Sequence, residues 1–107
     1  MGRGMRQRIL HAAKLGNPDA QFRVGLDYLS REGGCSKDFK EGSHWVKKAA
    51  EQGLAKAQHN LAVLYRDGSG LKKDRRQALK WFKKAAQQGF AEAQFNVGIA
   101  YMYGNGH

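Results

Sequence analysis

The chain has 107 residues, of which 41% are hydrophobic, so it is long enough for one domain with a modest core. Its 19 Lys and Arg outnumber its 9 Asp and Glu, and the formal net charge of +10 favours acidic partners. No apolar run approaches the ~20 residues of a membrane-spanning helix. A single cysteine excludes an intrachain disulfide, and the absence of a signal-peptide pattern at the N-terminus favours the cytoplasm.

Two helices are predicted in the first part of the chain. The first covers residues 3–15, where apolar residues recur three and four positions apart. Gly16 ends it, because glycine adopts the left-handed conformation of a helix C-terminus at little cost. Asn17 followed by proline is typical of an N-cap and a first helical position, so a second helix is predicted over residues 18–29. Residues 30–36 form a predicted loop.

Four further helices follow as two pairs with the same pattern. They are predicted over residues 38–52, 55–66, 75–88 and 91–103. Asp38 and Asp74 are the predicted N-caps of the first helix in each pair, and each has Glu or Gln three residues later, which completes a capping box. Gly53 and Gly89 separate the members of a pair. These turns are so short that the two helices of a pair must be antiparallel.

The pairs are copies of one unit. The segment from Trp81 to Tyr101 repeats the segment from Trp45 to Tyr65 at a spacing of 36 residues, and a partial copy precedes both. A fixed period of this size indicates a repeat array. A single repeat domain is therefore predicted over residues 1–107, compatible with a segment of a longer array. Its parts are a partial unit over 3–16, units over 17–53 and 54–89, and a partial unit over 90–107.

Each unit has an apolar face that it cannot cover alone. Trp81 and Phe82, with alanines before and after them, recur at helical spacing on one face of the helix 75–88. Leu61 and Tyr65 form the matching stripe on the helix before it. The tryptophan supplies a large area for burial, and the alanines let a neighbouring helix approach closely. Stacking of consecutive units is expected to bury both faces.

The repeated motif resembles the Sel-one-like repeat family (SLR), which is related to the tetratricopeptide repeats. The matching residues are Ala57-Gln58, Tyr65, Gly68, Gly70, Asp74, Ala78, Trp81, Lys84-Ala85-Ala86 and Gly89, and again Ala93-Gln94, Val97-Gly98 and Tyr101. Arg8 and Gly42 depart from the pattern, at positions of Trp and Ala. The resemblance covers about residues 5–106. It implies an all-α, right-handed solenoid of about six helices in antiparallel hairpins, and a non-enzymatic scaffold or adaptor for protein–protein interaction.

In each unit we call the first helix (18–29, 55–66 or 91–103) the leading helix and the second (38–52 or 75–88) the trailing helix. The first candidate site is the face of each leading helix that points away from its buried stripe, which contains the Ala-Gln pair and the tyrosine of the motif. In tetratricopeptide-like superhelices the leading helix lines the concave groove. Apolar side chains there would supply contact area for a peptide or protein partner, and amides would bind its backbone. The candidate residues are Phe22, Arg23, Leu26, His59, Asn60, Val63, Phe95, Asn96 and Ile99. The alternative is that the apolar members pack between units.

The second candidate site is a basic band on the trailing helices, predicted to lie opposite the tryptophans. Its residues are Lys40, Lys47, Lys48, Lys73, Arg76, Lys80, Lys83 and Lys84. The band favours, as the alternative function, electrostatic binding of nucleic acid or an anionic membrane, with an affinity that falls steeply with salt. A solvated helix face is the simpler interpretation of such lysine runs.

Signals for catalysis, metals or cofactors are weak. The four histidines, His11, His44, His59 and His107, are not at metal spacing with a cysteine or carboxylate. The segment from Gly68 to Lys73 is only faintly similar to a phosphate loop, since no strand precedes it. We therefore expect no enzymatic activity, no metal and no cofactor. Uncapped apolar ends of the array would permit self-association.

Overall fold

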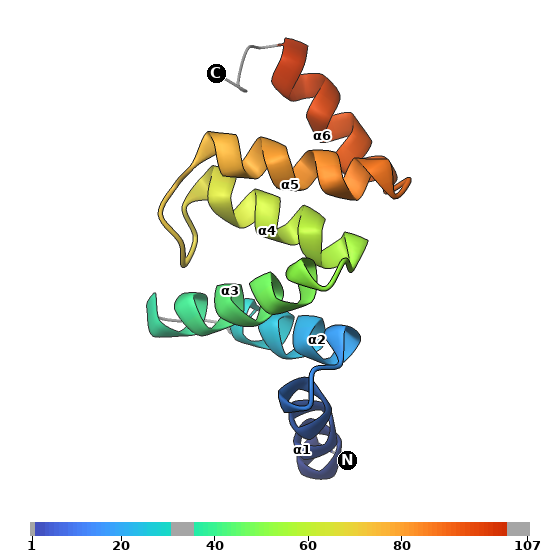
Figure 1. The fold of residues 1–107 in the computed structure, drawn as a ribbon. Helices are drawn as coiled ribbons and strands as arrows, with labels where there is room; N and C mark the ends of the chain where they lie inside the picture. The colour runs from blue at the N-terminus through green and yellow to red at the C-terminus, as the bar shows by residue number, and fades with distance from the viewer. Residues whose placement is uncertain (1, 31–35, 103–107) are drawn as a thin grey trace.

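The part of the chain that the structure describes contains six α-helices stacked in sequence order (Figure 1). A computed structural model describes residues 2–30 and 36–102, and within these ranges no strand occurs. The helices are α1 (Gly2–Lys14), α2 (Pro18–Leu29), α3 (Ser36–Glu51), α4 (Ala55–Asp67), α5 (Arg75–Gln87) and α6 (Ala91–Met102). The predicted all-α solenoid is thereby confirmed. Residues 31–35 of the predicted loop, which include Cys35, and His107 lie outside the described residues, whereas Ser36 is the first residue of α3.

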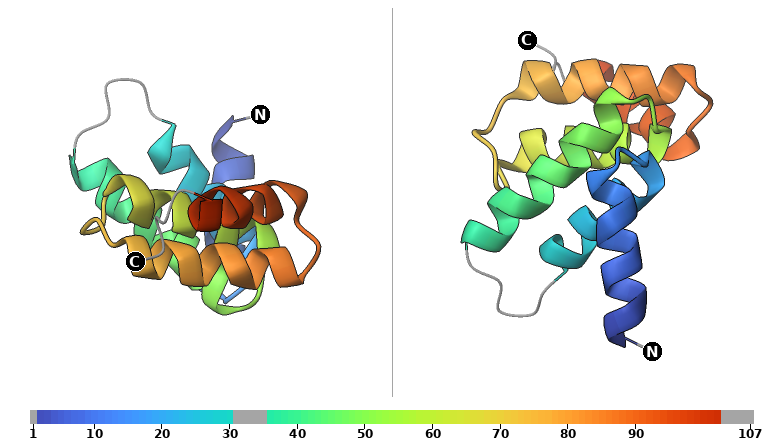
Figure 2. Two further views of the ribbon diagram at one scale, coloured as in Figure 1. Left: turned by 90° about the horizontal axis from the view of Figure 1, so that it is seen from above. Right: turned by 60° about the horizontal axis from the view of Figure 1, so that its bottom comes forward.

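The stack is elongated, with extents of 46 × 29 × 19 Å. Each helix packs against the helices next to it in sequence. Figure 2 shows from two further sides that α1 projects from one end of the stack, whereas α5 and α6 form the other. In a stack of this kind almost all packing is between sequence neighbours, as expected for a repeat array.

Local signals in the sequence place most helix boundaries. The Asn17 side chain accepts a hydrogen bond from the Ala20 N–H at 3.0 Å, which caps α2. Asp74 Oδ1 accepts from the N–H groups of Arg76 and Gln77 at 3.0 and 3.1 Å, which caps α5. These two predicted N-caps are confirmed, and the caps fix where the chain turns from one helix into the next.

The predicted N-cap at Asp38 is wrong. Helix α3 begins at Ser36, so Asp38 lies in its first turn rather than before it. An acidic side chain is favourable at either place, because both lie close to the unpaired N–H groups and the positive end of the helix dipole. The same residue type therefore suits two registers, and the helix begins at Ser36, three residues before the start that an N-cap at Asp38 indicates.

The core lies where α3, α4 and α5 meet. Val46, Leu61 and the alanines around them are almost fully buried there. Trp81 is 7% exposed and belongs to this core, whereas Trp45 is only partly buried. The tryptophan side of α5 therefore packs into the stack as predicted from the repeat. Alanine at most of the crossing positions keeps the helix axes close together.

Glutamine side chains connect the two helices of each hairpin. The residue after the recurrent alanine of each leading helix donates from Nε2 to a backbone carbonyl near the end of the preceding trailing helix. These bonds run from Gln21 to Ala13, from Gln58 to Ala50 and from Gln94 to Ala86, at 3.1, 3.3 and 3.2 Å. Each of these carbonyls also accepts the N–H of the turn glycine three residues later, so the Ala-Gln motif adds a second hydrogen bond at each helix end.

The glutamine that follows each trailing helix makes a second set of bonds, to the turn before its own unit and to the glutamine of its own leading helix. Gln88 Nε2 donates to the carbonyl of Gly53 at 2.8 Å and to Gln58 Oε1 at 2.9 Å. Gln52 makes the same two bonds one unit earlier, to Gly16 and Gln21, at 2.7 and 2.8 Å. The Gln-Gly pair that ends each trailing helix therefore joins that helix to the leading helix of its own unit and to the turn before it.

Replacing Gln88 with alanine is expected to lower the free energy of unfolding by about 1–3 kcal/mol, because the Gly53 carbonyl and the buried Gln58 amide both lose a donor. Gln87→Ala is the matched control, since Gln87 is exposed and is expected to change stability by less than about 0.5 kcal/mol. Urea unfolding followed by circular dichroism measures both. Equal stabilities of the two variants would show that these glutamine bonds do not hold the stack.

Helices α2 and α3 cross at a pair of glycines. A Cβ atom at Gly25 would lie 2.7 Å from Val46 Cγ2 and 2.9 Å from the Gly42 carbonyl oxygen. Gly42 is therefore required where the repeat usually has alanine, since each glycine leaves room for the other helix. The equivalent position on α6 is Gly98, where an added Cβ would meet nothing within 4 Å.

Replacing Gly25 and Gly98 with alanine is expected to change the stability of the fold in opposite directions. Gly98→Ala should stabilise the fold by about 0.5–1 kcal/mol, because it removes a helix-interior glycine without a clash. Gly25→Ala should destabilise it by about 1–3 kcal/mol through overpacking. Thermal unfolding of both variants tests the crossing. A stabilised Gly25→Ala would mean that α2 and α3 lie further apart than described.

Candidate functional site

Two adjoining hollows lie between α4 and α6, on the side of the leading helices. The first, the inner groove, is an open cavity of about 500 Å³ with walls formed by His59, Val63, Arg66, Glu92, Phe95 and Asn96. The second, the cationic pocket, has a volume of about 290 Å³ and lies where the end of α4 and the start of α5 face α6. Arg66 and Asn96 line both cavities, so the two are adjacent and are together called the depression between α4 and α6.

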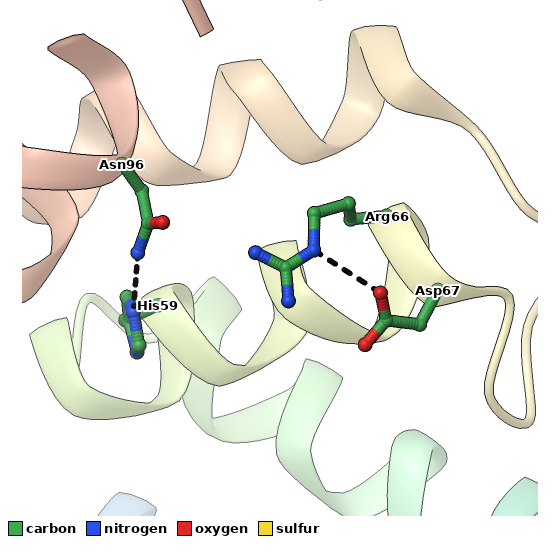
Figure 3. Close-up of polar contacts among 4 residues, drawn as sticks. All are labelled: His59, Arg66, Asp67 and Asn96. Carbon is green, nitrogen blue, oxygen red and sulfur yellow. Dashed lines mark hydrogen bonds and ion pairs between the residues drawn. The ribbon is translucent and has the colours of Figure 1, made fainter. Parts of the chain in front are cut away.

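The boundary between the hollows is held by a polar contact between α4 and α6. The Asn96 amide nitrogen lies 3.2 Å from His59 Nε2 (Figure 3). The same nitrogen also donates to the Glu92 carbonyl at 3.0 Å. An amide nitrogen donates, so His59 Nε2 accepts in this arrangement. The His59 ring is 8% exposed and packs against the rings of Phe90 and Phe82, with centroids 5.1 and 5.5 Å away. His59 therefore positions Asn96 instead of presenting its own ring.

The structure brings part of the predicted groove set together. His59, Val63, Phe95 and Asn96 surround the inner groove, and Ile99 lines the cationic pocket. Phe95 is 68% exposed and is the most accessible apolar side chain of the set. The other predicted residues, Phe22, Arg23, Leu26 and Asn60, line neither cavity. Phe22 packs against the core, which agrees with the alternative of packing between units.

Three cations of the cationic pocket were not assigned to a groove by the sequence. Arg66 follows His59 and Val63 at spacings of seven and three residues, so helical periodicity places it on the same face of α4. Lys73 was predicted in the basic band but lines the pocket, together with Arg75. Arg66 Nε donates to Asp67 Oδ1 at 3.1 Å, and both side chains are about half exposed, 47% and 49% (Figure 3).

The lysines of α5 and α3 do not lie opposite the tryptophans as predicted. Lys80 and Lys84 place their Nζ atoms 5.8 and 5.5 Å from the ring centroid of Trp81, and Lys48 lies 5.2 Å from that of Trp45. A long lysine stem three residues after, or one before, an indole can fold over the ring and keep its charge in water. These lysines therefore cover the aromatic faces of their own helices.

The rest of the basic band is spread over the surface. Arg76, Lys80, Lys83 and Lys84 line a shallow depression along α5, and Lys83 also lies 5.1 Å from the ring of Tyr101. Lys40 lies beside the turn after α4, and Lys47 is partly buried. Because Trp81 is buried beneath its lysines, its ring is not open to stacking by a nucleic-acid base.

Other site chemistries have little support in the part of the chain that the structure describes. No group of three or more His, Cys, Asp or Glu side chains there could hold a metal ion. Among the same residues, no helix combines the length and the apolar character that crossing a bilayer requires. The depression between α4 and α6 is therefore the place where concavity, apolar surface and polar groups coincide.

Comparison with known proteins agrees with the repeat pattern. The family described as "Sel1 repeat" matches residues 18–54, 55–90 and 91–107. The component HRD3A of an ERAD-associated E3 ubiquitin-protein ligase from Arabidopsis thaliana is 33% identical over 64 residues, which is 60% of this chain and 9% of that protein.

Solved structures with the same fold are also known. A Sel1 repeat protein from Oxalobacter formigenes is 40% identical, with a TM-score of 0.85 over 94% of this chain and 41% of that one. The protective antigen c5321 of uropathogenic Escherichia coli, which has an SLR fold, is 37% identical, with a TM-score of 0.87 over 94% of this chain and 21% of that one. The chain thus spans less than half the length of each of these relatives.

Proposed function

This chain belongs to the Sel1 repeat family, and on that basis we propose that it binds a protein partner in the depression between α4 and α6. Proteins of this family generally mediate protein–protein interactions on a non-catalytic scaffold. The relative from Arabidopsis thaliana is named as one component of a multi-protein ligase, which fits a scaffold role. The partner is expected to be a peptide segment or an exposed loop, since the two cavities are small, with volumes of about 290 and 500 Å³.

One observation carries the proposal: the inner groove and the cationic pocket are adjacent and combine accessible apolar side chains with polar groups. Phe95 and Val63 supply apolar contact from two different helices, and Asn96 lies between them and the pocket. The contact with His59 holds the Asn96 amide in place, so a bound peptide would meet a preorganised group. Such a combination is typical of surfaces that capture an extended segment.

Site-specific photo-crosslinking in the source organism tests the proposal. A benzophenone side chain is introduced at Val63 or at Phe95, which face the same groove from α4 and α6, and at Leu15 and Lys80 as controls outside it. Both groove positions are expected to capture the same protein, and the controls are not. Capture of that protein equally from Leu15 or Lys80, or of different proteins from the two groove positions, would contradict the proposal.

The alternative function, charge-driven binding of nucleic acid or an anionic membrane along α5, makes a different prediction. Its affinity should fall steeply as salt rises, because each neutralised phosphate releases counterions. Groove binding also buries apolar area, so its affinity should fall less steeply with salt than that of a ligand held by charge alone. A salt titration with single-stranded RNA, with anionic vesicles and with the crosslinked partner therefore separates the two functions.

A further inference from the structure

We propose that the partner segment is acidic, with carboxylate side chains bound at Arg66, Lys73 and Arg75 and a neighbouring apolar side chain in the inner groove. This inference rests on the proposed function and names the chemistry of its ligand. The occupant is taken to be an internal segment of a protein, because the two cavities are adjacent and share Arg66 and Asn96, so one extended chain could contact both.

The charge of the cationic pocket is the first reason. Three cations line it, contributed by α4, by the residue before Asp74 and by the first turn of α5, and Asp67 is the only carboxylate on its walls. Asp67 occupies only the Nε of Arg66, so the two terminal nitrogens of that guanidinium stay available. Within the described part of the chain, neither Lys73 nor Arg75 forms an ion pair. A carboxylate entering the pocket would therefore find charge-assisted donors without displacing an existing pair.

The apolar walls are the second reason. Leu79, Phe82 and Ile99 line the cationic pocket beside its cations, and Phe95 lies on the far side of Asn96. An acidic segment that also contains leucine or another apolar residue can use both surfaces. A strongly hydrated ligand that has charge but no apolar group does not suit this site. It would lose water on binding without making apolar contacts to the walls.

The amide between the two hollows supplies a third contact. Asn96 Nδ2 is used twice, toward His59 and the Glu92 carbonyl, and no described residue donates to its Oδ1. This oxygen is thus free to accept a backbone N–H from a segment that runs from the pocket to the groove. Together the three contacts specify a carboxylate, a backbone N–H and an apolar side chain in that order along the ligand.

Binding of synthetic peptides to the full chain tests the inference. The probe is a fluorescent twelve-residue peptide that alternates glutamate with leucine, has blocked ends and is followed by anisotropy. Its isostere carries glutamine in place of every glutamate. The acidic peptide is expected to bind, and the isostere about tenfold more weakly or not at all, because hydrogen bonds to charged partners are the strong ones.

Protein variants then locate the charge that matters. Arg66→Gln and Arg75→Gln are each expected to lower the affinity for the acidic peptide about tenfold. Lys80→Gln removes the same charge from α5 outside the pocket, and its affinity should change less than about twofold at 0.15 M salt. All three residues are exposed, so unchanged melting curves are expected and confirm that folding is intact. Equal losses in Arg66→Gln and Lys80→Gln would overturn the inference, because they would reduce it to net charge.

The remaining outcomes separate this inference from the proposed function. If the isostere binds as tightly as the acidic peptide while crosslinking at Phe95 persists, the groove is the site but the choice of an acidic ligand is wrong. If the acidic peptide binds with an affinity that neither Arg66→Gln nor Phe95→Ala alters, and crosslinking at Phe95 fails, both proposals are wrong. Single-stranded DNA can also be used as a competitor for the acidic peptide. If it displaced the peptide equally well from the wild-type chain and from Arg66→Gln, the inference would be overturned, because binding would then not depend on the cationic pocket.

Discussion

Gly70→Ala is expected to destabilise the fold by more than about 3 kcal/mol, because the residue combines a positive φ with a backbone contact to another helix. Gly70 has φ +73°, and an added Cβ would overlap the Phe39 carbonyl oxygen and lie 2.8 Å from Ser43 Oγ. Ser43 Oγ in turn donates to the Gly70 carbonyl at 3.3 Å. The turn between α4 and α5 is thus docked on α3, and a methyl group would push it away.

Gly53→Ala is the control that separates the two contributions to this effect. Gly53 also has a positive φ, +97°, but an added Cβ would meet nothing within 4 Å. Only backbone strain is therefore expected, at about 1–2 kcal/mol. Urea unfolding followed by far-ultraviolet circular dichroism measures both variants. If Gly70→Ala were no more destabilising than Gly53→Ala, the turn after α4 would not rest on α3.

Leu61→Ala is expected to destabilise the fold by about 2–5 kcal/mol, the usual range for a cavity left by a buried leucine. Leu61 is fully buried at 0% exposure, in the cluster that joins α4 to α3 and α5. Leu15→Ala removes the same atoms from a side chain that is 75% exposed, and should change stability by less than about 0.5 kcal/mol. The same urea titration compares them, and similar effects of the two substitutions would contradict the stacked core.

Much of the fold could be predicted because the repeat makes burial visible as periodicity. The turn glycines and the alanine and tryptophan positions recur for steric reasons that act within one hairpin. The hydrogen bonds of the glutamines could not be predicted in this way. Repetition indicates that Gln52 and Gln88 matter, but their partners lie 36 and 35 residues away and only the stacked geometry brings them within reach.

The candidate site was predicted only in part, for two physical reasons. The candidate face of α4 was selected because it carries apolar and amide side chains. Arg66 was therefore left out, although helical periodicity places it on the same face as His59 and Val63. The lysine band was placed by helical angles at the backbone, which do not account for a four-carbon stem. That stem lets Lys84 lie over Trp81, and a turn before α5 lets Lys73 face the pocket.

The cations on α5 and those near α6 lie in different surroundings and therefore have different effects. On α5, two of the lysines cover an indole and stay in contact with water, so they contribute solubility and packing. Near α6, the cations lie beside apolar walls in a concave site, where a ligand loses water and each interaction counts for more. If the proposed site is correct, a chain with a net charge of +10 would still distinguish one acidic ligand from another by shape.

The most direct test is an amide chemical-shift titration of the ¹⁵N-labelled chain with the glutamate–leucine peptide. If the depression between α4 and α6 is the binding surface, the largest shifts will fall on Val63, Arg66, Phe95 and Asn96, and the amides of Lys80 and Lys84 will hardly move. Shifts concentrated along α5 at Lys80 and Lys84, or spread evenly over all six helices, would contradict it.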